Sequence, residues 1–128
     1  MPSNSKKSAL ILFAHGAREP AWAEPFKAVR DRVAAARPDL AVELAFLEVM
    51  SPALGDCVDR LVAAGHERVT VAPLFLAMGG HLKQDLPRLV QEIRGRHGRL
   101  EISLLPPIGE TPALLDAIAA WLVNAAPR

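Results

Sequence analysis

The pattern that most constrains this chain is an alternation of short apolar runs with amphipathic stretches, repeated four times. The apolar runs predict buried strands over residues 8–14, 41–49, 69–77 and 100–105. Pro73 interrupts the third run and removes a ladder donor, so that strand is expected to bend or end early. The stretches between the runs carry apolar residues at helical spacing. They predict helices over 20–36, from a Ser51–Pro52 cap to Gly65, after Gly79-Gly80-His81, and after Thr111–Pro112. In the last helix the apolar stripe is expected to hold Leu115, Ile118, Ala119 and Leu122.

Four strand–helix units with short connections predict one α/β domain, a parallel sheet covered by helices on both faces. A flavodoxin-like winding has the strand order 2-1-3-4. Ligands bind such sheets where the winding reverses, here between the C-terminal ends of the first and third strands. We expect residues 8–126 to form this single domain, preceded by a flexible N-terminus over residues 1–7.

Two histidines fall at this predicted crevice. His15 ends the first strand and His81 follows the third, so the two imidazoles are expected to be neighbours. Glu48 ends the second strand and is expected to point toward the same edge. Two imidazoles and a carboxylate suit a divalent iron, cobalt or nickel ion, with open positions for a substrate. A histidine after a strand also commonly serves as a cap or hydrogen-bonding residue, so the topology alone leaves both roles open.

Charged and glycine residues surround the two histidines. Arg18 and Lys83 flank them and can bind ligand carboxylates, or they can be ordinary charged residues at helix starts. Gly79 and Gly80 can present backbone donors to an anion, or let a flat ligand approach the backbone. Neither GxGxxG nor GxxxxGK[ST] occurs in the sequence, so dinucleotide and nucleoside triphosphate sites are unsupported.

Composition excludes several function classes. Lys and Arg total 15 against 14 Asp and Glu, a balance that argues against a general nucleic-acid binder. No apolar run is long enough to cross a membrane, and the polar start lacks a signal-peptide core. We therefore expect a cytoplasmic protein with neither nucleic acid nor membrane as a partner. Cys57, the single cysteine, is interpreted as a buried helix residue, and His66 and His97 as surface or helix-end residues.

Four segments resemble the small sirohydrochlorin chelatases, the class II tetrapyrrole chelatases of siroheme and cobalamin synthesis. The segments are LILFAHGAREP, VELAFLEVMSPAL, VTVAPLFLAMGGHLKQDLP and LLPPIGETPALL, in the family's order and spacing over residues 9–122. The HG[SA]R and GGH[LV]K elements are specific when taken together.

The resemblance implies a flavodoxin-like chelatase fold that inserts a divalent metal, cobalt or iron and in related proteins nickel, into sirohydrochlorin. The metal is then a substrate, and no permanently bound cofactor is expected. His15 and His81 match the metal-binding histidines, and Glu48 matches the acidic residue of the FLE element. Larger relatives fuse two such lobes around the tetrapyrrole, so the resemblance suggests a homodimer that builds the cleft from two copies.

In this hypothesis the histidine pair holds the metal, and a freed imidazole or Glu48 accepts a pyrrole proton. A non-catalytic metal or tetrapyrrole carrier would need the same ligands, and only turnover separates the two. Histidine phosphatases also place His-Gly after a first strand, but they need an arginine directly before that histidine. Ala14 occupies the position here.

Overall fold

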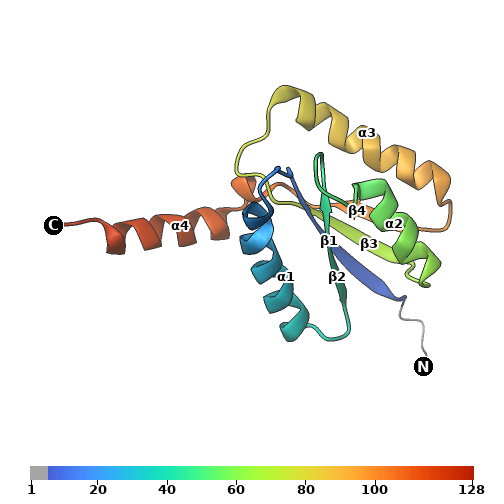
Figure 1. Cartoon of the computed structure of the whole chain (residues 1–128), viewed down its shortest axis with the longest axis horizontal. Helices are drawn as coiled ribbons and strands as arrows, with labels where there is room; N and C mark the ends of the chain where they lie inside the picture. The colour runs from blue at the N-terminus through green and yellow to red at the C-terminus, as the bar shows by residue number, and fades with distance from the viewer. Residues whose placement is uncertain (1–5) are drawn as a thin grey trace.

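The computed structural model describes residues 6–128 and contains one four-stranded parallel sheet. The strands are β1 Ser8–Ala14, β2 Ala41–Phe46, β3 Arg68–Pro73 and β4 Glu101–Leu104. Their order across the sheet is β2-β1-β3-β4, and all three neighbouring pairs are parallel, which confirms the predicted winding (Figure 1). The C-terminal ends of β1 and β3 are therefore adjacent at one edge of the sheet.

Four α-helices and two short 3-10 helices connect and follow the strands. They are η1 Pro20–Ala23, α1 Glu24–Ala36, α2 Leu54–Ala63, α3 Gly80–Arg96, η2 Ile108–Glu110 and α4 Pro112–Ala125. The first predicted helix thus divides into η1 and α1, which places Pro25 in the first turn of α1, where a proline is tolerated. No helix in the described part of the chain is both long and apolar enough to cross a bilayer.

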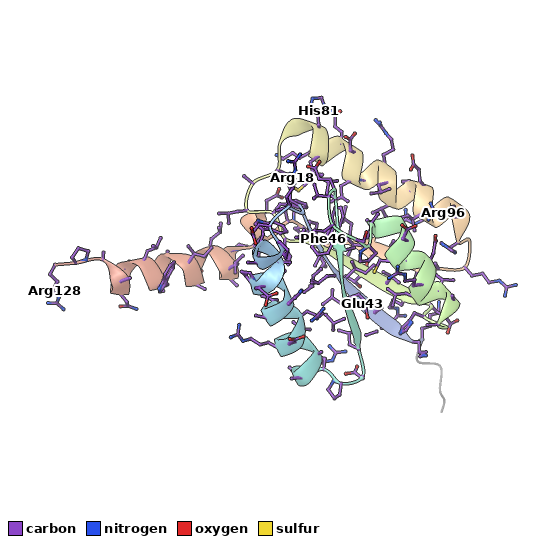
Figure 2. All side chains as sticks on the ribbon, viewed as in Figure 1. Arg18, Glu43, Phe46, His81, Arg96 and Arg128 are labelled. Carbon is purple, nitrogen blue, oxygen red and sulfur yellow. The ribbon has the colours of Figure 1, made fainter. Side chains whose placement is uncertain are left out.

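One face of the sheet packs against α1. Its core contains alternate residues of β1 and β2, among them Leu12, Leu44 and Phe46, together with half-buried Phe26 of α1. Figure 2 labels Phe46, which is the last residue of β2. Because α1 contacts β1 and β2 but makes no comparable set of contacts with β3 or β4, it covers only half of this face.

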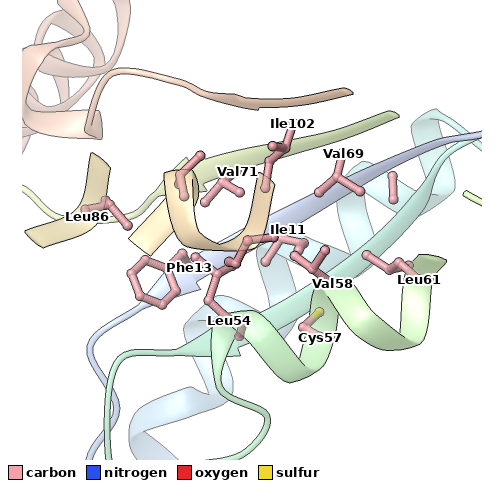
Figure 3. Close-up of a cluster of buried hydrophobic side chains, with 14 of the residues drawn as sticks. Ile11, Phe13, Leu54, Cys57, Val58, Leu61, Val69, Val71, Leu86 and Ile102 are labelled. Carbon is pink, nitrogen blue, oxygen red and sulfur yellow. The ribbon is translucent and has the colours of Figure 1, made fainter. Parts of the chain in front are cut away.

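The other face packs against α2 and α3. Ile11, Phe13 and Val71 of the sheet meet Val58 of α2 and Leu86 of α3, all of them nearly or fully buried (Figure 3). Burying a large apolar side chain stabilises the fold by roughly 1.5–3 kcal/mol. The buried cluster on this face is larger than the one under α1, so it contributes the larger share of the apolar burial, and Leu86 anchors α3 to it.

The start of α2 differs from the prediction. The helix begins at Leu54, so Ser51 and Pro52 do not cap it. Instead, the Pro52 carbonyl accepts a hydrogen bond of 2.9 Å from the Phe46 N–H at the end of β2. Segment 47–53 is thus a loop that returns to the strand it came from, and β2 ends at Phe46 rather than at residue 49.

The third strand ends early at its proline, as expected from Pro73. It ends at Pro73 rather than at residue 77, because proline has no N–H to donate to a neighbouring strand. One further hydrogen bond, from Leu74 N–H to the Phe13 carbonyl at 2.8 Å, pairs the residue after the proline with β1. The expected flexible start falls mostly on residues 1–5, which lie outside the described residues.

The apolar stripe of the last helix predicted that this helix packs on the sheet, but it does not. Figure 1 shows α4 extending away from the body of the molecule, with its C-terminal end far from every strand. None of its residues is buried, and its main contacts are with η2. Leu115 and Leu122 of the predicted stripe are exposed, so this part of the prediction is wrong for a single chain.

Candidate functional site

The ends of β1 and β2 bring His15 and Glu48 together. Beyond the strands, the backbone pairing continues for two more bonds, from Leu47 N–H to the Ala14 carbonyl and from Glu48 N–H to the His15 carbonyl. The imidazole Nδ1 of His15 consequently lies 3.3 Å from Oε1 of Glu48. Both side chains are more than half exposed, at 53% and 59%, so the pair is open to solvent and to a ligand.

Gly16 makes this close approach of the two loops possible. Its φ of 97° lies in the region that only glycine adopts readily. A Cβ at this position would lie 1.9 Å from the carbonyl oxygen of Glu48. The glycine of the HGxR element is therefore needed so that the β1 loop can run directly against the β2 loop, which positions Glu48 beside His15.

Phe75 supports the imidazole of His15 from the third strand's side. The two ring centroids lie 5.9 Å apart at an interplanar angle of 78°, an edge-to-face contact. Phe75 is itself buried and packs edge-on against Phe13 of β1. Between Glu48 and Phe75 the imidazole is held on two sides, while Nε2 remains directed away from the carboxylate that faces Nδ1.

His81 lies in the first turn of α3 and is exposed (Figure 2). Gly79 precedes the helix with φ −69° and ψ 165°, and no side chain caps this end. Nothing lies within 4 Å of the positions that a Cβ would take at Gly79 or Gly80. These two glycines are therefore required neither by a strained backbone nor by close packing, and the space beside them is free for a flat ligand.

The two expected carboxylate-binding cations occupy separate hollows. Lys83 lines an open cavity of about 470 Å³ between α3 and the β4–η2 loop, together with Met78 and Glu110. Arg18 lines another of about 370 Å³ beside η1, shared with Lys27. Arg18 and Lys83 are both exposed, so each is accessible to an anionic ligand.

The structure brings two of the three predicted metal-ligating residues into contact. His15 and Glu48 are in contact, as expected from the adjacency of their strands. Among residues 6–128, no three His, Cys, Asp or Glu side chains are close enough together to hold a metal ion, so His81 does not join the pair here. The assignment of His15, His81 and Glu48 as metal and catalytic residues stays a prediction.

The other two histidines lie at helix ends, as expected, and at the end of the sheet opposite to His15. His97 ends α3, and its Nε2 lies 2.7 Å from Oδ1 of Asp59 on α2. His66 follows α2, and its Nδ1 lies 3.1 Å from the Leu61 carbonyl. Both histidines therefore serve to hold the ends of helices in place. Cys57 is buried as predicted, and this burial raises the pKa of its thiol to about 11.

Two supporting residues were not identified from the sequence. Phe75 is a buried core residue, and no sequence pattern indicated its edge contact with His15. Gly16 was not singled out, although a glycine directly after a strand-ending histidine is a signal for a close backbone approach.

The sequence model of the CbiX family matches residues 9–125. The chain belongs to the CbiX family. Among curated relatives, a sirohydrochlorin cobaltochelatase of Methanosarcina barkeri is 28% identical over 121 residues, covering 93% of each chain. The sirohydrochlorin cobaltochelatase of Methanothermobacter thermautotrophicus is 32% identical over 101 residues, 77% of this chain and 70% of the relative.

Solved structures of related proteins have the same fold as this CbiX chain. A CbiX protein of Marinobacter aquaeolei VT8 superposes with a TM-score of 0.80 at 33% identity, covering 91% of this chain and 95% of that one. The sirohydrochlorin chelatase SirB of Bacillus subtilis subspecies spizizenii, in complex with cobalt, superposes with a TM-score of 0.72 at 26% identity. That match covers 94% of this chain but 51% of SirB, so this CbiX chain spans about half of the larger protein.

Proposed function

We propose that this CbiX chain is a sirohydrochlorin chelatase that inserts Co²⁺ or Fe²⁺ into the macrocycle. The contact between His15 and Glu48 at the winding reversal carries the proposal, because it presents an imidazole and a carboxylate at an open edge. Curated relatives of nearly equal length named sirohydrochlorin cobaltochelatase support the same activity. No permanently bound cofactor is proposed, because the metal is itself a substrate; nickel is an additional candidate.

Insertion requires that a metal ion be presented to four inward-facing nitrogens and that two pyrrole N–H protons be removed. In the proposal Nδ1–H of His15 donates to the Glu48 carboxylate, 3.3 Å away. This hydrogen bond selects the tautomer whose Nε2 lone pair is free to bind the ion, and a carboxylate partner of this kind strengthens a histidine ligand. Glu48 therefore orients and polarises His15 and offers an alternative acceptor for a pyrrole proton.

His81 supplies the second imidazole from the first turn of α3. As the macrocycle nitrogens replace the two imidazoles on the metal, each freed imidazole takes one pyrrole proton, so both protons are accounted for. The imidazolium formed at His15 lies beside the Glu48 carboxylate, which stabilises the positive charge. Binding through few ligands is suited to this task, because a closed four-ligand site would retain its metal.

The remaining predicted residues orient the macrocycle. Sirohydrochlorin carries eight carboxylate arms, and Arg18 and Lys83 are exposed cations in the two hollows that flank the site. Gly79 and Gly80 leave the entrance beside α3 free of side chains, so a flat ring can approach the backbone there. We further propose that two copies of the chain build the cleft, and that the protein acts in the cytoplasm without nucleic acid or membrane partners.

The testing experiment mixes the purified protein anaerobically with sirohydrochlorin and Co²⁺ or Fe²⁺. The macrocycle's absorption is followed against the spontaneous rate for His15→Ala, His81→Ala and a control, His66→Ala. His66 is a matched control because it is a histidine at the other end of the sheet. We expect multiple-turnover acceleration that is lost in the first two variants and kept in the control. Binding without turnover would favour the carrier, and an unchanged rate in both site variants would contradict the assignment.

A further inference from the structure

Val49 has a backbone conformation that valine rarely adopts. Its φ is 68°, and it is the one residue other than glycine with a positive φ among those that the structure describes. The Met50 N–H donates to the Glu48 carbonyl at 2.7 Å, so the three residues form a tight γ-turn with Val49 at its centre. For a β-branched residue this conformation is strained, and it persists only where the surroundings enforce it.

Hydrogen bonds and packing hold this turn in place on both sides. Before it, the Glu48 N–H donates to the His15 carbonyl at 3.0 Å. After it, half-buried Met50 packs against the core under α1, and the Phe46 N–H donates to the Pro52 carbonyl at 2.9 Å, which closes the loop. The turn therefore fixes the backbone of Glu48, whose carboxylate faces His15.

The side chain of Val49 is not needed for this arrangement. It is 64% exposed, so the core does not depend on it. A glycine would form the same turn without strain, because glycine adopts a positive φ readily. What valine adds is an exposed apolar side chain directly after Glu48. A strained residue whose side chain is exposed beside a functional pair is typical of a contact with a ligand.

The hollow that Val49 lines combines apolar and cationic groups. Its volume is about 370 Å³, and Arg18, Lys27 and Phe46 also line it; Figure 2 labels Arg18 and Phe46. Lys27 is paired with Glu24 at 3.2 Å, whereas no carboxylate within residues 6–128 forms a salt bridge with Arg18. A hollow of this size is too small for a whole octacarboxylate macrocycle, but it accommodates one of its arms.

We propose that Val49 is a substrate-binding residue that orients the macrocycle. Its side chain packs against the face of one pyrrole ring while Arg18 binds the carboxylate arm of that ring. This contact places the central nitrogens over the His15 imidazole, and it removes water from beside Glu48, which strengthens the interaction between the carboxylate and the imidazole. The inference rests on the proposed chelatase function and adds a residue that selects the macrocycle without touching the metal.

The first test titrates metal-free sirohydrochlorin into the protein and follows the macrocycle's absorption. Val49→Ala removes both methyl groups, and Val49→Asn replaces them with an amide in a residue that tolerates a positive φ. We expect the dissociation constant to rise about five- to tenfold in Val49→Ala and at least as much in Val49→Asn. Val29→Ala is the matched control, because Val29 is an exposed valine that does not line the hollow. Wild-type affinity in either Val49 variant would overturn the proposal.

The second test separates a contact with the substrate from a role in the fold. Val49→Gly relieves the strain, so its melting temperature at one protein concentration should be unchanged or higher, by up to about 6 °C. In steady-state insertion its KM for sirohydrochlorin should rise, while the dependence of the rate on Co²⁺ stays that of wild type, because Val49 has no metal-binding atom in its side chain. A lower melting temperature together with a wild-type KM would assign Val49 to the fold and overturn the proposal.

The two tests also distinguish this inference from the proposed function. A wild-type protein that binds the macrocycle without turnover, and loses that binding in the Val49 variants, would refute the chelatase activity and support the inference. Normal insertion by wild type with an unchanged KM in every Val49 variant would refute the inference alone. A wild-type protein that does not bind the macrocycle would overturn both.

Discussion

Replacement of Gly16 by alanine tests whether the contact between the β1 and β2 loops holds the site together. Two effects act at this position. An alanine at φ 97° is strained, which costs about 1–3 kcal/mol. Its Cβ would also lie 1.9 Å from the Glu48 carbonyl oxygen, well inside a normal contact, so the loops must separate by at least about 1 Å.

Together these effects should lower the free energy of unfolding by about 2–6 kcal/mol, because overpacking adds about 1–3 kcal/mol to the backbone strain. For a chain of this length the melting temperature should fall by about 7–22 °C. The same separation should weaken the contact between His15 and Glu48, so the insertion rate should fall even at temperatures where the variant is folded.

The assay is thermal and urea unfolding followed by circular dichroism at one fixed protein concentration, because a dimer's apparent stability depends on concentration. Gly79→Ala is the matched control, since Gly79 has an ordinary φ of −69° and nothing within 4 Å of a Cβ. It should change stability by less than about 1 kcal/mol, because the only loss is that of a glycine at the N-cap of α3. Equal stability of Gly16→Ala and Gly79→Ala would refute the argument that the Gly16 contact is required.

Three further predictions concern the body of the domain. Cys57, whose thiol pKa is raised to about 11 by burial, should not react with a thiol reagent at pH 8 until the protein unfolds; rapid labelling of the native state would contradict its burial. The hydrogen bond from His97 lowers the pKa of the Asp59 carboxyl below its ordinary 3.8, so this pair stabilises the fold above that pH and less as the pH falls below it. Asp59→Asn should therefore lose less than about 1 kcal/mol at pH 7 in urea unfolding, with the difference from wild type shrinking below pH 4; a difference that grew in acid would oppose this. Val58→Ala should destabilise the fold by about 2–3 kcal/mol because Val58 is fully buried, whereas Val29→Ala, at a partly exposed site of α1, should lose less than about 1 kcal/mol; similar values for both would contradict the core described here.

The sequence predicted the sheet and the adjacency of the strand ends that carry His15 and Glu48 because both depend on patterns that act along the chain. Continuous apolar runs indicated buried parallel strands, and the strand order placed His15 beside Glu48, a contact that the structure confirms. The failures lie where a local pattern does not specify which other segment it will contact. Pro52 resembled a helix start, but its carbonyl pairs with the end of β2.

The last helix shows the same limit more strongly. Its apolar stripe correctly indicated a helix, but a stripe does not specify whether or where the helix packs, and here Leu115 and Leu122 are exposed. The importance of Gly16 was missed for a related reason, since the obstacle is the Glu48 carbonyl, which lies 32 residues away in the sequence. The functional role of His81 likewise depends on how near the start of α3 lies to His15 and Glu48, which the position of His81 in the sequence does not determine.

The most direct measurement is the initial rate of Co²⁺ insertion into sirohydrochlorin at limiting metal, compared between wild type, His15→Ala and the His66→Ala control. The account predicts that His15→Ala loses most of the enzymatic rate above the spontaneous reaction and that the control keeps it. A His15→Ala variant with the full wild-type rate at limiting metal would contradict the central claim that this imidazole presents the metal.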